Sequence, residues 1–140
     1  MQLLSISSTG VFAYFIKLFT FSKWNHSAIY FDDMGIVVDS TLKTGVRKTT
    51  YESFITRYPN YDVSVIEVPD LEASKEFAFA QVGKPYDWTA IFGLVFRNSW
   101  EEPDSWFCSE LAESIIKAGG LQRFRDSLSK LVPKETRAVK

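Results

Sequence analysis

Two short apolar runs joined by a glycine-containing turn constrain the fold of this chain more than any other feature. The runs are His26–Phe31 and Ile36–Leu42, and Asp32-Asp33-Met34-Gly35 lies between them. Short runs rich in β-branched and aromatic residues are typical of strands, and a polar turn with glycine is typical of a β-hairpin. We therefore predict an antiparallel sheet with this hairpin at its centre.

Further strands and helices are predicted around the hairpin. Runs of the same kind predict strands at Leu3–Ile6, Val46–Lys48 and Val63–Val68. Ser8-Thr9 offers an N-cap for a helix over Gly10–Thr20, which is apolar on nearly all sides. Burial in the core is the default explanation for that helix, and an apolar substrate-binding groove or a membrane-facing surface is the alternative.

The other predicted helices are recognised by their caps. Thr49 and Glu52 fit a capping box for a short helix ending near Tyr58. Pro69-Asp70 begins a helix that Gly83 ends, with an apolar side made of Leu71, Phe77, Ala78 and Val82. Asp87 caps a helix over Trp88–Phe96, and Asp104 or Ser105 caps a last helix to Lys117. The expected fold class is α+β, a small antiparallel sheet packed against helices.

Length and composition favour one globular domain over residues 1–140. The chain is 46% hydrophobic and 24% charged, and no repeat or long linker divides it. The net charge of −1 argues against nucleic acid as a partner, because a basic footprint is missing. The apolar window from Gly10 to Phe21 is too short for a membrane span and lacks the features of a signal peptide. We expect a cytoplasmic protein, with release or delivery by another route as the alternative.

The single cysteine, Cys108, lies where the last helix is expected to begin. One cysteine excludes an intramolecular disulfide, and one cysteine with one histidine cannot form the usual four-ligand zinc site. We predict neither a metal nor a cofactor. Leu111, Ala112 and Ile115 share the helix face of Cys108, so the thiol should point toward the sheet. It is either a small buried apolar group or a nucleophile activated by the helix start.

His26 supplies a candidate base for that nucleophile, because it is the only imidazole in the chain. If Asp33 and Met34 form the centre of the hairpin turn, Asp39 faces Ala28 and lies diagonal to His26 on the same side of the sheet. Asp39 would then orient the imidazole, as the third member of a triad does. A register shift of one residue would place Ser40 there instead. An ordinary carboxylate at a strand end is the other interpretation of Asp39.

Tyr86 is a fourth candidate site residue. It follows Pro85 in the turn Gly83-Lys84-Pro85-Tyr86-Asp87. From such a turn its phenol could reach a site and donate a hydrogen bond to a developing oxyanion. A half-buried packing tyrosine is the alternative interpretation.

Four segments together resemble a known family. They are His26-Ser27-Ala28-Ile29-Tyr30, Val37-Val38-Asp39, Gly83-Lys84-Pro85-Tyr86-Asp87 and Phe107-Cys108-Ser109-Glu110-Leu111. This pattern resembles the circularly permuted branch of the NlpC-type papain-like cysteine peptidases, the YiiX-like group, of which lecithin–retinol acyltransferase-like proteins are more distant members. In that branch the histidine strand precedes the cysteine helix. The usual N-terminal Gly-Asp of the family is absent here, and Asn25 stands where a serine is common.

The resemblance implies a permuted papain-like fold and a site with assigned roles. It implies Cys108 as nucleophile, His26 as base, Asp39 as orienting group and Tyr86 beside the thiol. The expected activity is hydrolysis of an amide bond, in a peptidoglycan fragment or another small peptide, through an acyl-enzyme. A thiol acyltransferase or lipid-acting hydrolase on an acyl substrate, and a catalytically silent binding module, are the alternatives.

Overall fold

The computed structural model describes residues 1–10, 13, 23–87 and 108–123. The helices expected over Gly10–Thr20 and Trp88–Phe96 lie outside the described residues, as do the expected caps Asp104 and Ser105. The described part contains a sheet flanked by helices on both faces, which confirms the α+β prediction.

The sheet has five strands in the order β4-β3-β2-β1-β5, and every neighbouring pair is antiparallel. The strands are β1 (Gln2–Ile6), β2 (His26–Phe31), β3 (Ile36–Thr41), β4 (Gly45–Thr50) and β5 (Tyr61–Val65). The N-terminal strand β1 is therefore not an edge strand but lies between β2 and β5. The central hairpin of β2 and β3 follows the prediction from the sequence.

The register of the central hairpin is the one expected for a turn centred on Asp33 and Met34. Ala28 pairs with Asp39, and Phe31 pairs with Ile36. The alternative register that would replace Asp39 by Ser40 is therefore wrong. Since side chains alternate between the two faces of a strand, Asp39, Ala28 and His26 lie on the same face.

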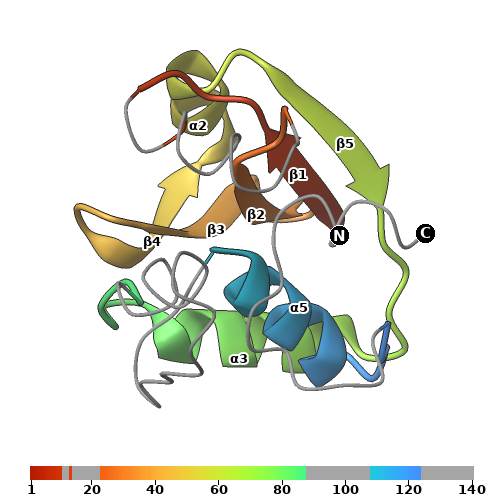
Figure 1. The fold of residues 1–140 in the computed structure, drawn as a ribbon. Helices are drawn as coiled ribbons and strands as arrows, with labels where there is room; N and C mark the ends of the chain where they lie inside the picture. Colours follow the sequence, from red (N-terminus) through yellow and green to blue (C-terminus); the bar gives the residue numbers. More distant parts are fainter. Residues whose placement is uncertain (11–12, 14–22, 88–107, 124–140) are drawn as a thin grey trace.

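The two faces of the sheet are covered by different helices, as Figure 1 shows. Helix α2 (Tyr51–Arg57) covers one face through the buried Phe54, which packs with Leu4, Ile6, Ala28 and Val37. Helices α3 (Leu71–Gln81) and α5 (Cys108–Ala118) lie together on the other face. Because the sheet is covered on both sides, its central strands carry buried apolar side chains on both faces.

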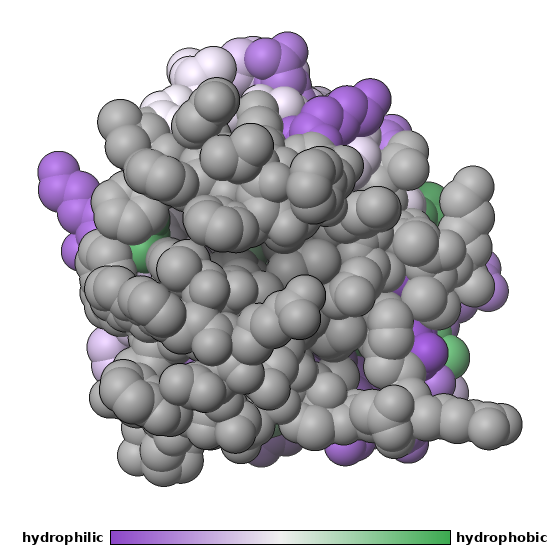
Figure 2. Space-filling model, in the orientation of Figure 1, coloured by the Kyte–Doolittle hydropathy of each residue, from purple (hydrophilic) through white to green (hydrophobic). Residues whose placement is uncertain are grey.

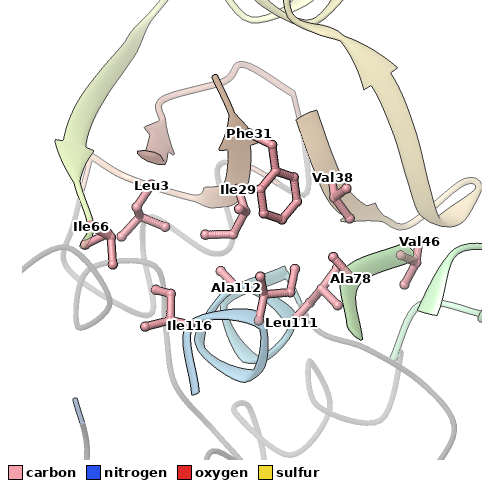
Figure 3. Close-up of a cluster of buried hydrophobic side chains, with 11 residues drawn as sticks. Leu3, Ile29, Phe31, Val38, Val46, Ile66, Ala78, Leu111, Ala112 and Ile116 are labelled. Atoms are coloured by element: carbon pink, nitrogen blue, oxygen red, sulfur yellow. The ribbon is translucent and has the colours of Figure 1, made fainter. Parts of the chain in front are cut away.

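The larger core lies between the sheet and α5. Figure 3 shows Leu111, Ala112 and Ile116 of α5 pointing at Leu3, Ile29 and Val38 of the sheet, with Ala78 of α3 beside them. Leu111, Ile115 and Ile116 are at most 1% exposed, and burying one such side chain stabilises the fold by about 1.5–3 kcal/mol. The predicted inward face of the cysteine helix is therefore confirmed.

Three local predictions were wrong. The N-cap of α2 is Thr50, whose side chain accepts from the Ser53 N–H, because Thr49 still belongs to β4 and pairs with Val37. Strand β5 begins at Tyr61 and ends at Val65, not at Val68, because its partner β1 provides no strand residue beyond Gln2. Val82 does not belong to the apolar side of α3, since it follows the helix as its C-cap and is 37% exposed.

On the face shown in Figure 2, the described residues are mainly polar. In Figure 2 the coloured atoms are mostly hydrophilic, with a few small hydrophobic patches. The larger apolar side chains that are exposed in the described part are Met34, Val63, Val65 and Val82, of which Val63 and Val65 share one face of β5. Among the residues described, no helix has the length and apolar character that crossing a membrane requires.

Candidate active site

The centre of the site is a pair formed by His26 and Asp39. His26 is the first residue of β2 and Asp39 lies on β3, on the same side of the sheet. The Nε2 atom of His26 lies 2.8 Å from Oδ2 of Asp39, and the Asp39 side chain is fully buried. With Nε2 engaged in this way, Nδ1 is the ring nitrogen left to exchange a proton with a reacting group.

Arg47 and Tyr58 complete the environment of Asp39. Arg47 lies opposite Asp39 on β4 and donates from Nε to Oδ1 at 2.9 Å and from Nη2 to Oδ2 at 3.1 Å. Arg47 also donates to the hydroxyl of Tyr58, whose ring centroid lies 5.6 Å from that of His26. A two-pronged guanidinium contact fixes the carboxylate more firmly than a single hydrogen bond would.

These contacts decide the protonation of the pair. Burial lowers the pKa of His26, but the hydrogen bond to Asp39 and the interaction with Cys108 outweigh it and raise the pKa to about 10. Burial raises the pKa of Asp39, whereas the hydrogen bonds from His26 and Arg47 lower it more, so the pKa lies below its ordinary value. At neutral pH the pair is therefore an imidazolium beside a carboxylate.

Cys108 lies at the first residue of α5 and is 2% exposed. Its thiol lies near the His26 ring, since the interaction with Cys108 is one of the causes of the raised His26 pKa. Helix α5 packs on β2 and β3 as well as on α3, and this packing places the start of the helix near His26, the first residue of β2. The only cysteine and the only histidine of the chain therefore meet.

Tyr86 is held near the thiol by the edge of the sheet. The N–H of Val46 donates to the carbonyl of Lys84 at 2.8 Å, and the N–H of Gly83 donates to the carbonyl of Val46 at 2.9 Å. These bonds fasten the turn that precedes Tyr86 to the start of β4. Burial, the charge of Cys108 and nearby carboxylates raise the pKa of Tyr86 well above its usual value, so its hydroxyl keeps its proton.

Asn25 fixes the segment that leads into His26. Its side-chain oxygen accepts from the Ser8 N–H at 2.8 Å, and its amide nitrogen donates to the Ser8 hydroxyl at 2.7 Å. Its own N–H donates to the carbonyl of Ile6 at 3.0 Å. The asparagine found in place of the more usual serine thus ties the end of β1 to the start of β2.

A cleft of about 690 Å³ opens beside His26. Its described lining comes from the loop after β1, the β3–β4 turn, the end of α2 and Tyr86: Ser8, Thr9, Gly10, Ala13, Asn25, His26, Ser40, Thr41, Leu42, Lys43, Thr44, Arg47, Arg57, Tyr58 and Tyr86. Cys108 is not part of this lining. His26 and Tyr86 line the cleft and also lie near the buried thiol.

The structure brings all four residues singled out from the sequence to one place, and it adds Arg47 and Tyr58. Arg47 could have been found from the second hairpin, because a turn centred on Lys43 puts it opposite Asp39, the pairing that is observed. Tyr58 had no comparable signal. It reaches His26 only because α2 packs across the sheet.

Comparison with known proteins gives one family. Residues 3–134 match the model of the family described as permuted papain-like amidase enzyme, YaeF/YiiX, C92 family. This match confirms the resemblance to the permuted papain-like, YiiX-like group. No curated protein matches the chain.

Proposed function

The chain belongs to the YaeF/YiiX, C92 family of permuted papain-like amidases, and on that premise we propose that it hydrolyses amide bonds through an acyl-enzyme on Cys108. The observation that carries the proposal is the buried His26–Asp39 pair, with Nε2 and Oδ2 2.8 Å apart, next to the cysteine. A base, a group that orients it and a thiol within its reach are what a cysteine nucleophile requires.

In the first step the Cys108 thiolate attacks the carbonyl carbon of the amide. The raised pKa of His26 supports an imidazolium–thiolate pair as the resting state, because the proton is held by the ring. The carbonyl oxygen becomes an oxyanion, and the backbone N–H of Cys108 and the hydroxyl of Tyr86 are the proposed donors to it. The pKa of Tyr86 is raised, which supports this role, since only the protonated phenol can donate.

The tetrahedral intermediate then collapses. His26 gives its proton from Nδ1 to the amide nitrogen, the C–N bond breaks and the amine leaves, so that an acyl thioester remains on Cys108. A water molecule, deprotonated by His26, attacks this thioester. The acid is released and the thiolate–imidazolium pair is restored.

Asp39 and Arg47 act through His26 and not on the substrate. Asp39 keeps Nε2 engaged, which leaves Nδ1 to face the thiol, and Arg47 keeps the carboxylate in place. The proposed substrates are small peptides, with peptidoglycan fragments as one source. Transfer of the acyl group to an acceptor other than water, and action on acyl lipids, would use the same thioester.

Thiol labelling and substrate trapping test this proposal. Near neutral pH, iodoacetamide should label Cys108 faster than it labels a free thiol, and His26→Gln should remove the advantage. The wild-type protein mixed with peptidoglycan fragments or with acyl thioesters should accumulate an acyl adduct on Cys108, seen by mass spectrometry. An adduct from the fragments alone supports amide hydrolysis, and one from the thioesters alone supports a lipid-acting enzyme. If Cys108 labels no faster than a free thiol and Cys108→Ala changes no activity, the chain is a silent binding module.

A further inference from the structure

Among the described residues that line the cleft beside His26, the charged ones are cations. Lys43, Arg47 and Arg57 line it, and no Asp or Glu is among its described lining residues. The chain as a whole carries a net charge of −1. The positive character is therefore local to the cleft and is not a property of the whole surface.

The charges of His26, Asp39, Arg47 and Cys108 do not account for the positive charge of the cleft. Arg47 is paired with Asp39, and in the proposed resting state the imidazolium of His26 faces the Cys108 thiolate. These four charges cancel as two of each sign. Lys43 and Arg57 remain, both on exposed positions, and none of the described Asp and Glu residues forms an ion pair with either.

Arg57 also faces a second cavity. It is the last residue of α2, and with Ser8, Thr9 and Tyr58 it lines both the main cleft and an adjoining cavity of about 390 Å³. The adjoining cavity adds Ser7, Pro59 and Asn60 to this wall. A cation at the C-terminal end of a helix is favourable for the helix dipole, which explains why a basic residue is tolerated there. The dipole does not explain why the side chain borders two cavities, one of which is lined by His26.

We propose that Lys43 and Arg57 form an anion-binding subsite that selects amide substrates with a carboxylate or phosphate group near the scissile bond. This inference rests on the proposed amidase function and specifies its substrate. A guanidinium binds a carboxylate or a phosphate with two parallel hydrogen bonds, and an ammonium adds a compact positive charge. In a cleft of this kind the two cations also concentrate anionic ligands before they bind.

Alkylation with a matched pair of reagents tests the field at the thiol. Iodoacetate and iodoacetamide both react by displacement of iodide by the Cys108 sulfur to give a thioether, and they differ in charge. The rate with iodoacetate divided by the rate with iodoacetamide therefore increases with positive charge near Cys108. The contribution of His26 to this ratio is the same in all variants. In Lys43→Gln and in Arg57→Gln the ratio should fall about two- to fivefold at low ionic strength, and added salt should lower the wild-type ratio.

Lys48→Gln is the matched control, because Lys48 is an exposed lysine of the same hairpin whose ammonium lies over the ring of Phe79, away from the cleft. Its rate ratio should equal that of the wild type. All three substituted residues are exposed, so unfolding midpoints should change only slightly. Equal ratios in the Lys43, Arg57 and Lys48 variants would overturn the subsite.

A binding experiment decides the question independently of thiol reactivity. Cys108→Ala protein is titrated calorimetrically with three ligands. They are an N-acetyl dipeptide that ends in a carboxylate, the same dipeptide ending in a carboxamide, and N-acetyl phosphoethanolamine.

Tighter binding of the carboxylate peptide or of the phosphate compound than of the carboxamide supports the subsite and identifies the source of the anion. This difference in affinity should disappear with Lys43→Gln and Arg57→Gln. Equal or tighter binding of the neutral peptide overturns the subsite. An unreactive Cys108 with intact anion binding would instead count against the nucleophile.

Discussion

At the scale of single residues, the site depends on one buried carboxylate that serves two cations. Asp39 binds His26 and Arg47 with hydrogen bonds of 2.8–3.1 Å and has no exposed surface. A buried charge is tolerated only when it is paired and hydrogen-bonded, and here both oxygens are engaged. The carboxylate thus orients the ring and raises the pKa of the imidazole at the same time.

Replacing Asp39 should change the pKa of His26 and the activity of the site. In Asp39→Asn the amide can still contact the ring but no longer holds its proton, so the pKa of His26 should fall toward its ordinary value. The value of kcat/KM should fall at least about 10²-fold, and NMR titration of the imidazole should show the lowered pKa. Asp32→Asn, in the exposed turn of the same hairpin, is the control and should leave both quantities unchanged. An unchanged His26 pKa in Asp39→Asn would contradict this account of the site.

The raised pKa of His26 also makes stability depend on pH. A group whose pKa is 6.5 when unfolded and about 10 when folded stabilises the fold fully below pH 6.5, and this contribution is lost as the pH rises through 10. The free energy of unfolding should therefore fall between pH 6.5 and 10, by about 1.4 kcal/mol for each unit of pKa displacement. Urea unfolding across this range should show the decline in the wild type. The curve of His26→Gln should be flatter, and parallel curves would exclude His26 as the cause.

At the scale of elements, the position of Tyr86 depends on a close backbone contact at Gly45. The Gly83–Pro85 turn is hydrogen-bonded to the start of β4 through Val46. Gly45 has a φ of +67°, and a Cβ atom there would overlap the carbonyl oxygen of Lys84. A side chain at this position would therefore have to push away the turn that carries Tyr86.

Gly45 and Gly35 form a matched pair that tests this contact. Gly35 has nearly the same φ, +68°, but a Cβ atom there meets nothing within 4 Å. Gly35→Ala should cost only the left-handed backbone penalty of about 1–2 kcal/mol and keep its activity. Gly45→Ala should cost more and should also lower kcat, because Tyr86 is displaced. Unfolding midpoints and kcat measured on the two variants compare directly, and equal effects on both would rule out the role given to the contact.

At the scale of the whole molecule, the sheet separates the larger apolar core on one face from the candidate site on the other. Helices α3 and α5 bury the larger core on one face, while His26, Asp39 and Arg47 lie on the face that α2 covers. The start of α5 connects the two sides, because Cys108 lies near His26, the first residue of β2. The large core therefore holds Cys108 in place.

A core substitution far along α5 should separate stability from catalysis. Ile116 is fully buried and lies two turns beyond Cys108. Ile116→Ala should destabilise the fold by about 2–5 kcal/mol, while the activity per folded molecule stays close to that of the wild type. Val65→Ala on β5, where Val65 is 72% exposed, should change the denaturation midpoint little. A loss of specific activity in fully folded Ile116→Ala would mean that the core does more than hold α5.

The sequence by itself determined the central hairpin and the pairing inside it. A turn centred on Asp33 and Met34 sets the register, and the alternation of side chains along a strand carries that register from Ala28 and Asp39 to His26. Helix periodicity likewise predicted that Cys108 points toward the sheet, and the residue is buried. These rules act over a few residues, so they can be read from a local stretch. The caps at Thr49 and the end of β5 were wrong because they depend on how far a neighbouring strand continues.

Only the tertiary structure decided what those local pieces meet. Three features join segments far apart in the chain: the approach of Cys108 to His26, the tilted ring of Tyr58 beside the imidazole, and the docking of the Tyr86 turn against Gly45. The cleft with Lys43 and Arg57 is formed in the same way, because the β3–β4 turn and the end of α2 come together only in the folded chain. Such contacts depend on how helices pack on a sheet, and packing is set by the shapes of many side chains at once. No periodic pattern in the sequence records it.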